Sequence, residues 1–249
     1  ALWRREMVRF VRQRSRITGA FAQPLVFWLL LGGGLNASFK PAGATAGTSY
    51  VAYFYPGTIV MVLLFTAIFS TISTVEDRKA GFLQGVLVAP IPRSAIVLGQ
   101  AMGGTSLAVI QGMMFLALAP FVGIPLSLAS IVSAFVVMTV VALALTSLGL
   151  IIAWRMDSTQ GFHAIMNLIL LPIWFLSGAF FPASGAPGPL RILMTINPLT
   201  YGMAALRRCI YLANPADVGP VPSMVPALVI TLIFAAAAFA FAVNSASRA

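Results

Sequence analysis

Long runs of apolar residues, separated by short polar breaks, occupy most of the chain. A helix needs about 20 apolar residues to cross the hydrocarbon core of a bilayer, so runs of this length predict membrane spans. We place six spans near residues 17–35, 51–75, 94–121, 127–153, 161–181 and 222–244. The predicted fold class is therefore all-α and polytopic, with residues 1–249 forming a single transmembrane domain.

The segment before the first predicted span, residues 1–16, carries apolar and basic positions at helical spacing. The two kinds fall on different faces, with Trp3, Met7, Phe10 and Val11 opposite Arg5, Arg9, Arg12 and Arg16. This pattern predicts an amphipathic helix in the membrane interface, with its arginines at lipid phosphates. A secretory signal is disfavoured because the following run has no small-residue cleavage site and ends in Gly32–Gly34.

The longest break among the predicted spans is residues 76–93, EDRKAGFLQGVLVAPIPR. Its apolar residues recur at helical spacing, at Phe82, Leu83, Val86 and Leu87. Pro90 and Pro92 then end the short helix and turn the chain back toward the bilayer. A short amphipathic helix between two spans either lies on the membrane or inserts into a partner protein.

Residues 182–221 are too apolar for a solvated loop, yet they contain prolines that exclude a full span. Two short helices, near 188–196 and 198–212, that enter the outer leaflet and return would satisfy both constraints. Irregular backbone at that depth must be covered by protein or water. We therefore expect a re-entrant helical pair before the sixth span.

Composition excludes a soluble domain, because the chain is 60% hydrophobic and 8% charged with a mean hydropathy of +0.98. The formal net charge is +10, and six of the fifteen Lys and Arg residues precede residue 17. This distribution fits membrane topology and anionic lipid better than a nucleic-acid partner. The opposite side carries only Lys40, Arg191, Arg207 and Arg208. Positive-inside bias therefore predicts that both termini and the 76–93 loop are cytoplasmic.

Acidic residues are absent from the centres of the predicted spans, which disfavours a proton- or ion-coupled carrier. Uncharged polar and aromatic residues remain as candidates to line a pathway: Thr66, Ser70, Gln100, Gln111, His163, Asn167, Trp174 and Phe175. The polar ones could instead only hydrogen-bond neighbouring helices, and the aromatic ones could form an interfacial belt. Gly99 and Gly103 form a GxxxG pattern, which permits close approach of a neighbouring helix.

Motifs for chemistry are absent from the sequence. Neither of the two lysines, Lys40 and Lys79, ends a phosphate-binding GxxxxGK[ST] loop. One His and one Cys cannot build a zinc site, and no nucleophile–base pair supports a membrane enzyme. We therefore expect no cofactor, metal or enzymatic activity on this chain. If the protein uses ATP, another chain binds it.

Three stretches carry a resemblance to a known family: residues 76–100, 171–182 (LPIWFLSGAFFP) and 196–207 (INPLTYGMAALR). With the six spans and the basic N-terminal helix, they resemble the ABC-2 type permeases of bacterial ATP-binding-cassette exporters. The similarity is strongest to the branch that exports daunorubicin-type drugs and nodulation factors, and it covers nearly the whole chain. It implies outward movement of an amphipathic, drug-like or lipid-linked substrate across the bacterial inner membrane.

The resemblance also implies that Gly81–Ala89 is a coupling helix bound by a separate ATPase subunit, which would hold ATP and magnesium. The residues implied in this contact are Phe82, Leu83, Val86 and Leu87, with Glu76, Asp77, Arg78 and Lys79 around them. Two permeases would assemble with two ATPases, with the pathway between the permeases and the N-terminal helix against the ATPase. Gln84 departs from more acidic relatives, which leaves the polar contacts open. An ion- or proton-coupled secondary transporter remains the alternative.

Overall fold

The computed structural model describes residues 2–12, 14–35, 49–88 and 90–248, with side chains except at 10–12, 14–21, 23, 35, 84, 87, 216 and 217. Within this part every regular element is a helix, which confirms the all-α fold class. The α-helices are α1 (Leu2–Arg12), α2 (Arg14–Leu35), α3 (Tyr50–Ser70), α4 (Ile72–Lys79), α5 (Phe82–Val88), α6 (Arg93–Leu116), α7 (Leu128–Ala153), α8 (Thr159–Trp174), α9 (Gly188–Ile196), α10 (Pro198–Ile210) and α11 (Met224–Ser247). A π-helix, η2 (Phe175–Ala179), continues α8, and short 3-10 helices are η1 (Ala119–Val122), η3 (Ala183–Gly185) and η4 (Pro215–Val218).

Five of the described helical segments are long and apolar enough to cross a membrane: Tyr50–Lys79, Arg93–Leu116, Leu128–Ala153, Thr159–Ala179 and Met224–Ser247. They correspond to the second to sixth predicted spans. The first predicted span falls on α2, whose described apolar part, Pro24–Gly34, is shorter. A membrane crossing by α2 therefore stays a prediction.

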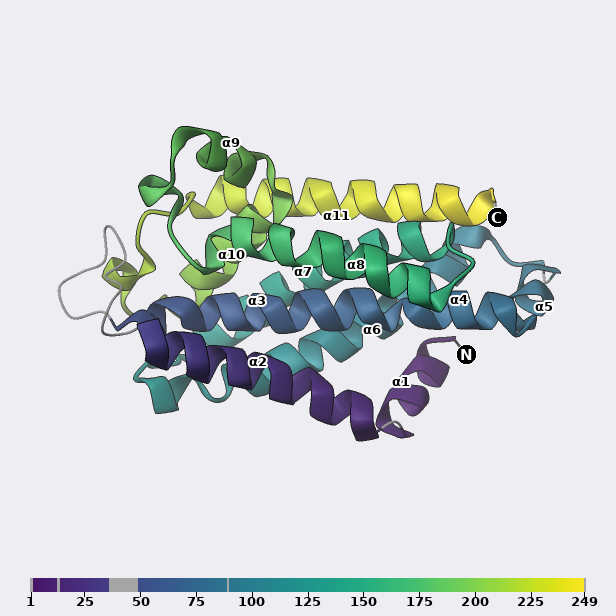
Figure 1. Cartoon of the computed structure of the whole chain (residues 1–249), viewed down its shortest axis with the longest axis horizontal. Helices are drawn as coiled ribbons and strands as arrows, with labels where there is room; N and C mark the ends of the chain where they lie inside the picture. Colours follow the sequence, from purple (N-terminus) through teal and green to yellow (C-terminus); the bar gives the residue numbers. More distant parts are fainter. Residues whose placement is uncertain (1, 13, 36–48, 89, 249) are drawn as a thin grey trace.

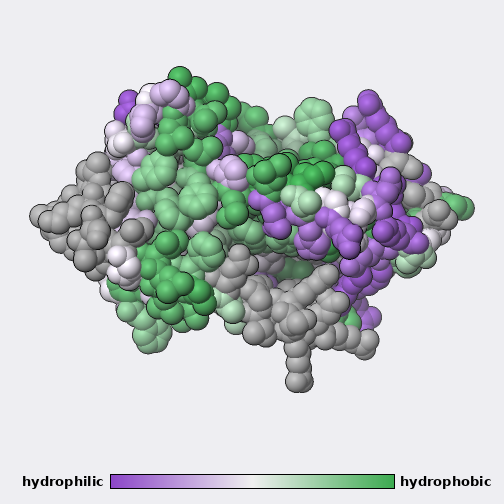
Figure 2. Space-filling model, viewed as in Figure 1, coloured by the Kyte–Doolittle hydropathy of each residue, from purple (hydrophilic) through white to green (hydrophobic). Residues whose placement is uncertain are grey.

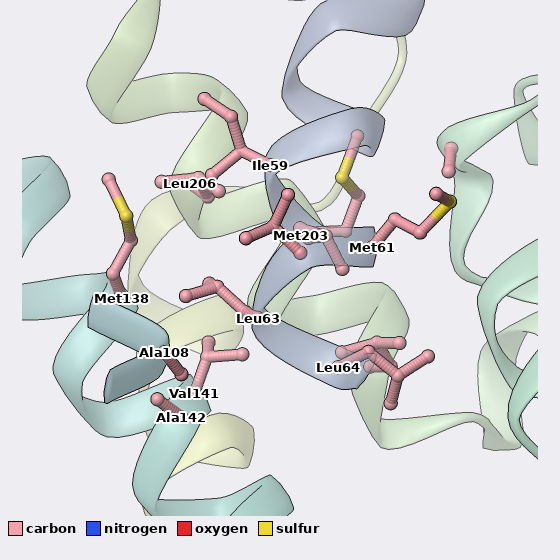
Figure 3. Close-up of a cluster of buried hydrophobic side chains, with 14 of the residues drawn as sticks. Ile59, Met61, Leu63, Leu64, Ala108, Met138, Val141, Ala142, Met203 and Leu206 are labelled. Atoms are coloured by element: carbon pink, nitrogen blue, oxygen red, sulfur yellow. The ribbon is translucent and has the colours of Figure 1, made fainter. Parts of the chain in front are cut away.

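Helix α3 lies inside the bundle, where it packs against α2, α6, α7, α8 and α10 (Figure 1). It carries no charged residue and is apolar on every side, as expected of a helix buried all round. Its side chains, including Ile59, Leu63 and Leu64, lie among those of α6, α7 and α10 (Figure 3). Gly104 of α6 lies at the crossing with α3 and α7, because a Cβ there would overlap the side chains of Ser70 and Thr146.

The two ends of the bundle differ. Helix α1, helix α5 and the C-terminal end of α11 lie together at one end, and α9 lies at the other (Figure 1). On the face in view, most hydrophilic residues gather at the α1–α5 end, and the remainder is mainly hydrophobic (Figure 2). This division is the one expected of a bundle whose body is in lipid and whose α1–α5 end is in water.

Helices α9 and α10 occupy the segment for which the sequence predicts two short helices, and Asn197 joins them. Its Oδ1 accepts a hydrogen bond from the Leu199 N–H at 3.0 Å, and its Nδ2 donates to the Ile173 carbonyl at 2.7 Å. Arg207, which the charge count places among the loop bases, is 1% exposed. Its guanidinium lies 4.0 Å from the Tyr53 ring centroid and donates to the Tyr53 carbonyl at 3.1 Å. Helix α10 is therefore part of the bundle.

Candidate functional site

The chain leaves α4 through a tight turn into α5, and we refer to residues 76–88 as the α4–α5 joint. The Ala80 N–H donates to the Glu76 carbonyl at 2.9 Å, and the Gly81 N–H donates to the Arg78 carbonyl at 3.1 Å. Gly81 has a φ of 73°, in the left-handed region that favours glycine. The residue spacing predicts a short helix in this loop, and the structure has α5 (Phe82–Val88) there; its role as a coupling helix is implied by the family resemblance and stays a prediction.

One face of α5 packs into the bundle and the other is exposed. Leu83 is fully buried, and Val86 packs against the same hydrophobic cluster. The other members of this cluster are Ile96, Val97, Ala101, Leu150, Trp154, Ala242 and Ala246. Phe82 and Val88 are instead 42% and 86% exposed. Leu83, one of the residues implied in the partner contact, is thus covered by the chain's own core. The side chain of Leu87, another of them, lies outside the described part.

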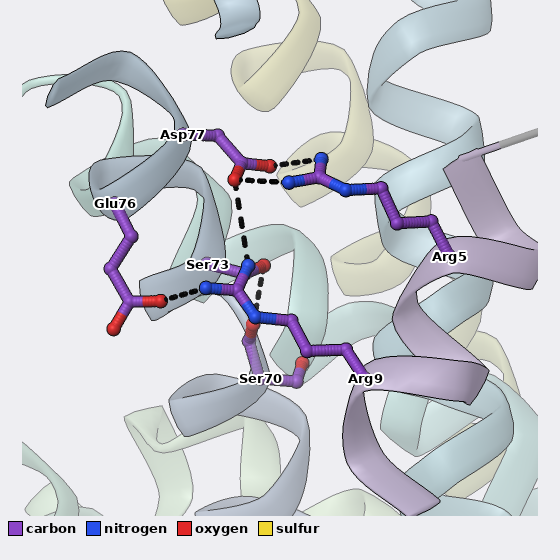
Figure 4. Close-up of polar contacts among 6 residues, drawn as sticks. All are labelled: Arg5, Arg9, Ser70, Ser73, Glu76 and Asp77. Carbon is purple, nitrogen blue, oxygen red and sulfur yellow. Dashed lines mark hydrogen bonds and ion pairs between the residues drawn. The ribbon is translucent and has the colours of Figure 1, made fainter. Parts of the chain in front are cut away.

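Two arginines of α1 reach the acidic pair at the end of α4 (Figure 4). The Arg5 guanidinium donates two parallel hydrogen bonds to Asp77, at 2.5 Å from Nη1 to Oδ2 and 2.6 Å from Nη2 to Oδ1. Arg9 pairs with Glu76 and also lies 3.4 Å from Asp77. The Asp77 side chain is 7% exposed, so these bonds compensate a carboxylate largely removed from water. The prediction that Arg5 and Arg9 lie at lipid phosphates is therefore corrected: they bind acids of α4.

The two basic residues of the joint, Arg78 and Lys79, differ in their contacts. Arg78 donates from Nη1 to the Trp154 carbonyl at 2.5 Å, and this carbonyl lies just beyond the end of α7. A cation is favourable there because the last carbonyls of a helix carry partial negative charge. Arg78 also lies 3.3 Å from Asp157, which is 91% exposed, so this second pair contributes little. Lys79 is exposed.

Helix α1 lies along the GxxxG face of α6. A Cβ built on Gly99 would stand 3.2 Å from the Leu2 Cβ, and one on Gly103 would stand 2.9 Å from the Glu6 Cβ. The Trp3 indole N–H donates to Ser106 Oγ at 3.0 Å in the same row. The neighbour that the GxxxG pattern admits is therefore the N-terminal helix.

Several predicted pathway residues are buried or half-buried and bond within the chain. Thr66 donates to Gln111 Oε1 at 2.5 Å, which joins α3 to α6. Ser70 donates to the Ala67 carbonyl of its own helix at 2.7 Å. Gln100 and Gln111 are buried, at 8% and 1% exposure, and Trp174 is buried with its indole N–H donating to the Gly57 carbonyl at 2.9 Å. The bonds of Thr66 and Trp174 each join two helices of this chain, whereas the bond of Ser70 stays within its own helix.

His163, Asn167 and Phe175 lie on an exposed face of α8 and its continuation. Exposed residues recur there at helical spacing, at Gln160, His163, Ala164, Asn167, Leu168, Leu171, Pro172 and Phe175. The His163 ring lies 5.2 Å from that of Phe69, centroid to centroid. This face is polar near the α1–α5 end and apolar farther along the span.

Comparison with known proteins adds a family to this geometry. The chain matches the family described as ABC-2 type transporter over residues 1–211, which include the joint, α8 and α10. It is 30% identical over 209 residues to putative transport permease ycf38 of Porphyra purpurea, covering 83% of this chain and 72% of that protein. It is 28% identical over 210 residues to nodulation protein J of Rhizobium leguminosarum bv. trifolii, covering 83% of this chain and 79% of that protein.

Proposed function

The chain belongs to the ABC-2 type transporter family, and from this membership we propose that it is the permease subunit of an ATP-binding-cassette exporter. A separate ATPase subunit binds ATP and magnesium and drives transport. The sequence supports this division, because neither lysine ends a phosphate-binding loop. The observation that carries the proposal is the α4–α5 joint, which presents apolar side chains at the polar end of the bundle.

The exposed apolar residues at this end form the ATPase contact. Phe82, Val88 and Ile91 are 42%, 86% and 44% exposed, on α5 and just after it. Helix α5 lies at the end of the bundle where hydrophilic residues gather, so lipid does not explain the exposure of its apolar residues (Figures 1 and 2). A cleft on the ATPase would bury them, and such a desolvated apolar cluster is typical of the energetic centre of an interface.

The α1–α5 end faces the cytoplasm, so both termini are cytoplasmic and the protein lies in a bacterial inner membrane. The strongest support is the concentration of Lys and Arg before residue 17, because basic residues accumulate on the cytoplasmic side. The ATPase then meets α5 where ATP is available.

The exposed face of α8 lies against a second copy of the chain, and the pathway runs between the two. Polar side chains such as His163 and Asn167 would be costly against lipid, so a protein or aqueous neighbour is favoured. Leu168, Leu171 and Phe175 continue the same face and suit an amphipathic, drug-like or lipid-linked cargo. The outward direction of transport is supported by the resemblance of this chain's sequence motifs to those of exporter permeases.

Val88→Asp tests the contact. Val88 is 86% exposed, so the chain should fold, whereas an unpaired carboxylate buried at the interface should weaken binding by about 100-fold. The measurements are co-purification with the ATPase subunit that the proposal requires, and the ATPase rate of the complex. Phe121→Asp, at an 87% exposed position in η1, is the control and should bind normally. If the two variants bound the ATPase equally well, the assignment of α5 to the ATPase contact would be wrong.

A further inference from the structure

The side chain of Arg5 spans the α4–α5 joint. On one side it makes the bidentate pair with Asp77, in the last turn of α4. On the other side its guanidinium lies 4.0 Å from the ring centroid of Phe82, the first residue of α5. Gly81, with its positive φ, lies between the two helices. A residue of α1 thus contacts both helices at the point where the backbone turns.

The helix that carries Arg5 is itself fixed to α6. Leu2 and Glu6 pack on Gly99 and Gly103, and Trp3 donates to Ser106. Because α6 begins at Arg93, directly after the loop, α1 contacts the chain on both sides of that loop. It therefore joins α4, α5 and α6 at the end where the proposed ATPase binds.

The contacts of Asp77 make Arg5 difficult to replace. Asp77 is 7% exposed, and its second cation, Arg9, lies at 3.4 Å and is shared with Glu76. Planar, bidentate pairing with a carboxylate, together with stacking on an aromatic ring, is a combination that a lysine cannot reproduce. Removal of Arg5 would leave this largely buried carboxylate with Arg9, 3.4 Å away, as the one cation paired with it among the described side chains.

We propose that Arg5 is a positioning residue for α5, and that α1 moves with α4, α5 and α6 as one unit when the ATPase drives the permease. The second half of this inference rests on the proposed function, because it assigns α5 to the ATPase contact. The first half concerns the isolated chain. Two separate experiments therefore test them.

The orientation of α5 can be measured in the chain alone. Spin labels at Val88→Cys and Arg155→Cys, both exposed positions, report the distance between α5 and the end of α7, and the native Cys209 is buried. We expect a narrow distance distribution that broadens in Arg5→Gln and stays partly broadened in Arg5→Lys. Arg4→Gln, at an exposed arginine next along α1, is the matched control and should leave the distribution narrow. An unchanged distribution in Arg5→Gln would overturn the positioning role.

A disulfide tests whether α1 stays on α6 during turnover. The Leu2 Cβ and a Cβ on Gly99 would stand 3.2 Å apart, close to the separation of about 3.5–4.5 Å in a disulfide. The Leu2→Cys, Gly99→Cys chain, oxidised and in complex with the ATPase, should keep the ATPase rate of its reduced form. Inhibition that a reductant reverses would show that α1 must leave α6, and would overturn the single-unit proposal. If the native chain fails to bind the ATPase, the proposed function fails instead, and the spin-label distances still decide the role of Arg5.

Discussion

Glu6 of α1 is a carboxylate in an unfavourable place. Burial raises its pKa, and the charge of Asp77 adds to the rise, while a hydrogen bond with Ser73 and the charges of Arg9 and Arg5 oppose it. The folded chain therefore holds this proton more tightly than the unfolded chain does. The stability that Glu6 contributes is fully present at low pH and is lost as the pH rises through its folded pKa.

Glu6→Gln should remove the loss of stability that ionisation of Glu6 causes as the pH rises. We expect the variant to have a higher melting temperature than the native chain at pH 8, with the difference shrinking toward pH 5. Thermal unfolding of the purified chain in detergent at both pH values measures it. Asp157→Asn, at a 91% exposed carboxylate, should give no such pH-dependent difference. A Glu6→Gln effect of equal size at both pH values would contradict the assignment to ionisation.

The stability of helix α5 depends on two glycines, whose replacement should have opposite effects. Gly81 adopts a positive φ before the helix, whereas Gly85 lies within it. Of the described atoms outside the local backbone, none lies within 4 Å of a Cβ at either position, so conformation rather than space decides both substitutions. Leu83 anchors this short helix to the bundle, because seven residues alone would not form a stable helix in water.

Alanine at the two glycines should act in opposite directions. Gly81→Ala should destabilise the joint by about 1–2 kcal/mol, because an L-residue is disfavoured in the left-handed region. Gly85→Ala should stabilise α5 by about 1 kcal/mol, through its higher helix propensity. Amide hydrogen exchange of α5 should become faster in the first variant and slower in the second. A change in the same direction in both would be inconsistent with these conformations.

The whole bundle buries α3 and leaves one face of α8 exposed. The predicted pathway residues divide accordingly: Trp174 is buried and Thr66 is half-buried, both bonded within the chain, whereas His163 and Asn167 face outward. A pathway lined by the outward set needs a second surface to close it. A second copy of the chain supplies that surface in the proposed assembly.

Cysteine crosslinking in membranes tests this arrangement. Asn167→Cys should join two copies with a short bifunctional thiol reagent, because the residue faces the proposed partner. Ile233→Cys, at a 63% exposed position on α11, should remain monomeric under the same conditions. Equal crosslinking at the two positions would place the partner elsewhere or indicate random collision. The buried native Cys209 should not react in either variant.

The elements follow from local patterns, but the contacts of the joint do not. The spacing of the apolar residues in 82–88, together with the prolines after them, predicts a short helix. Which of its apolar residues face inward depends on the position of α6, α7 and α11, so Leu83 and Val88 could not be distinguished. A signal for the α1 contact existed: Arg5 and Arg9 lie one helical turn apart, and Glu76 and Asp77 are rare acids in a basic chain.

The sequence by itself determined an all-helical membrane protein with apolar helices near the predicted spans, because length and hydrophobic periodicity are local properties of the chain. The tertiary structure alone decided that α1 binds α4 and α6. The pair of Arg5 with Asp77 joins residues 72 positions apart, and the free energy of such a pair depends on burial and geometry that exist only after the helices have packed.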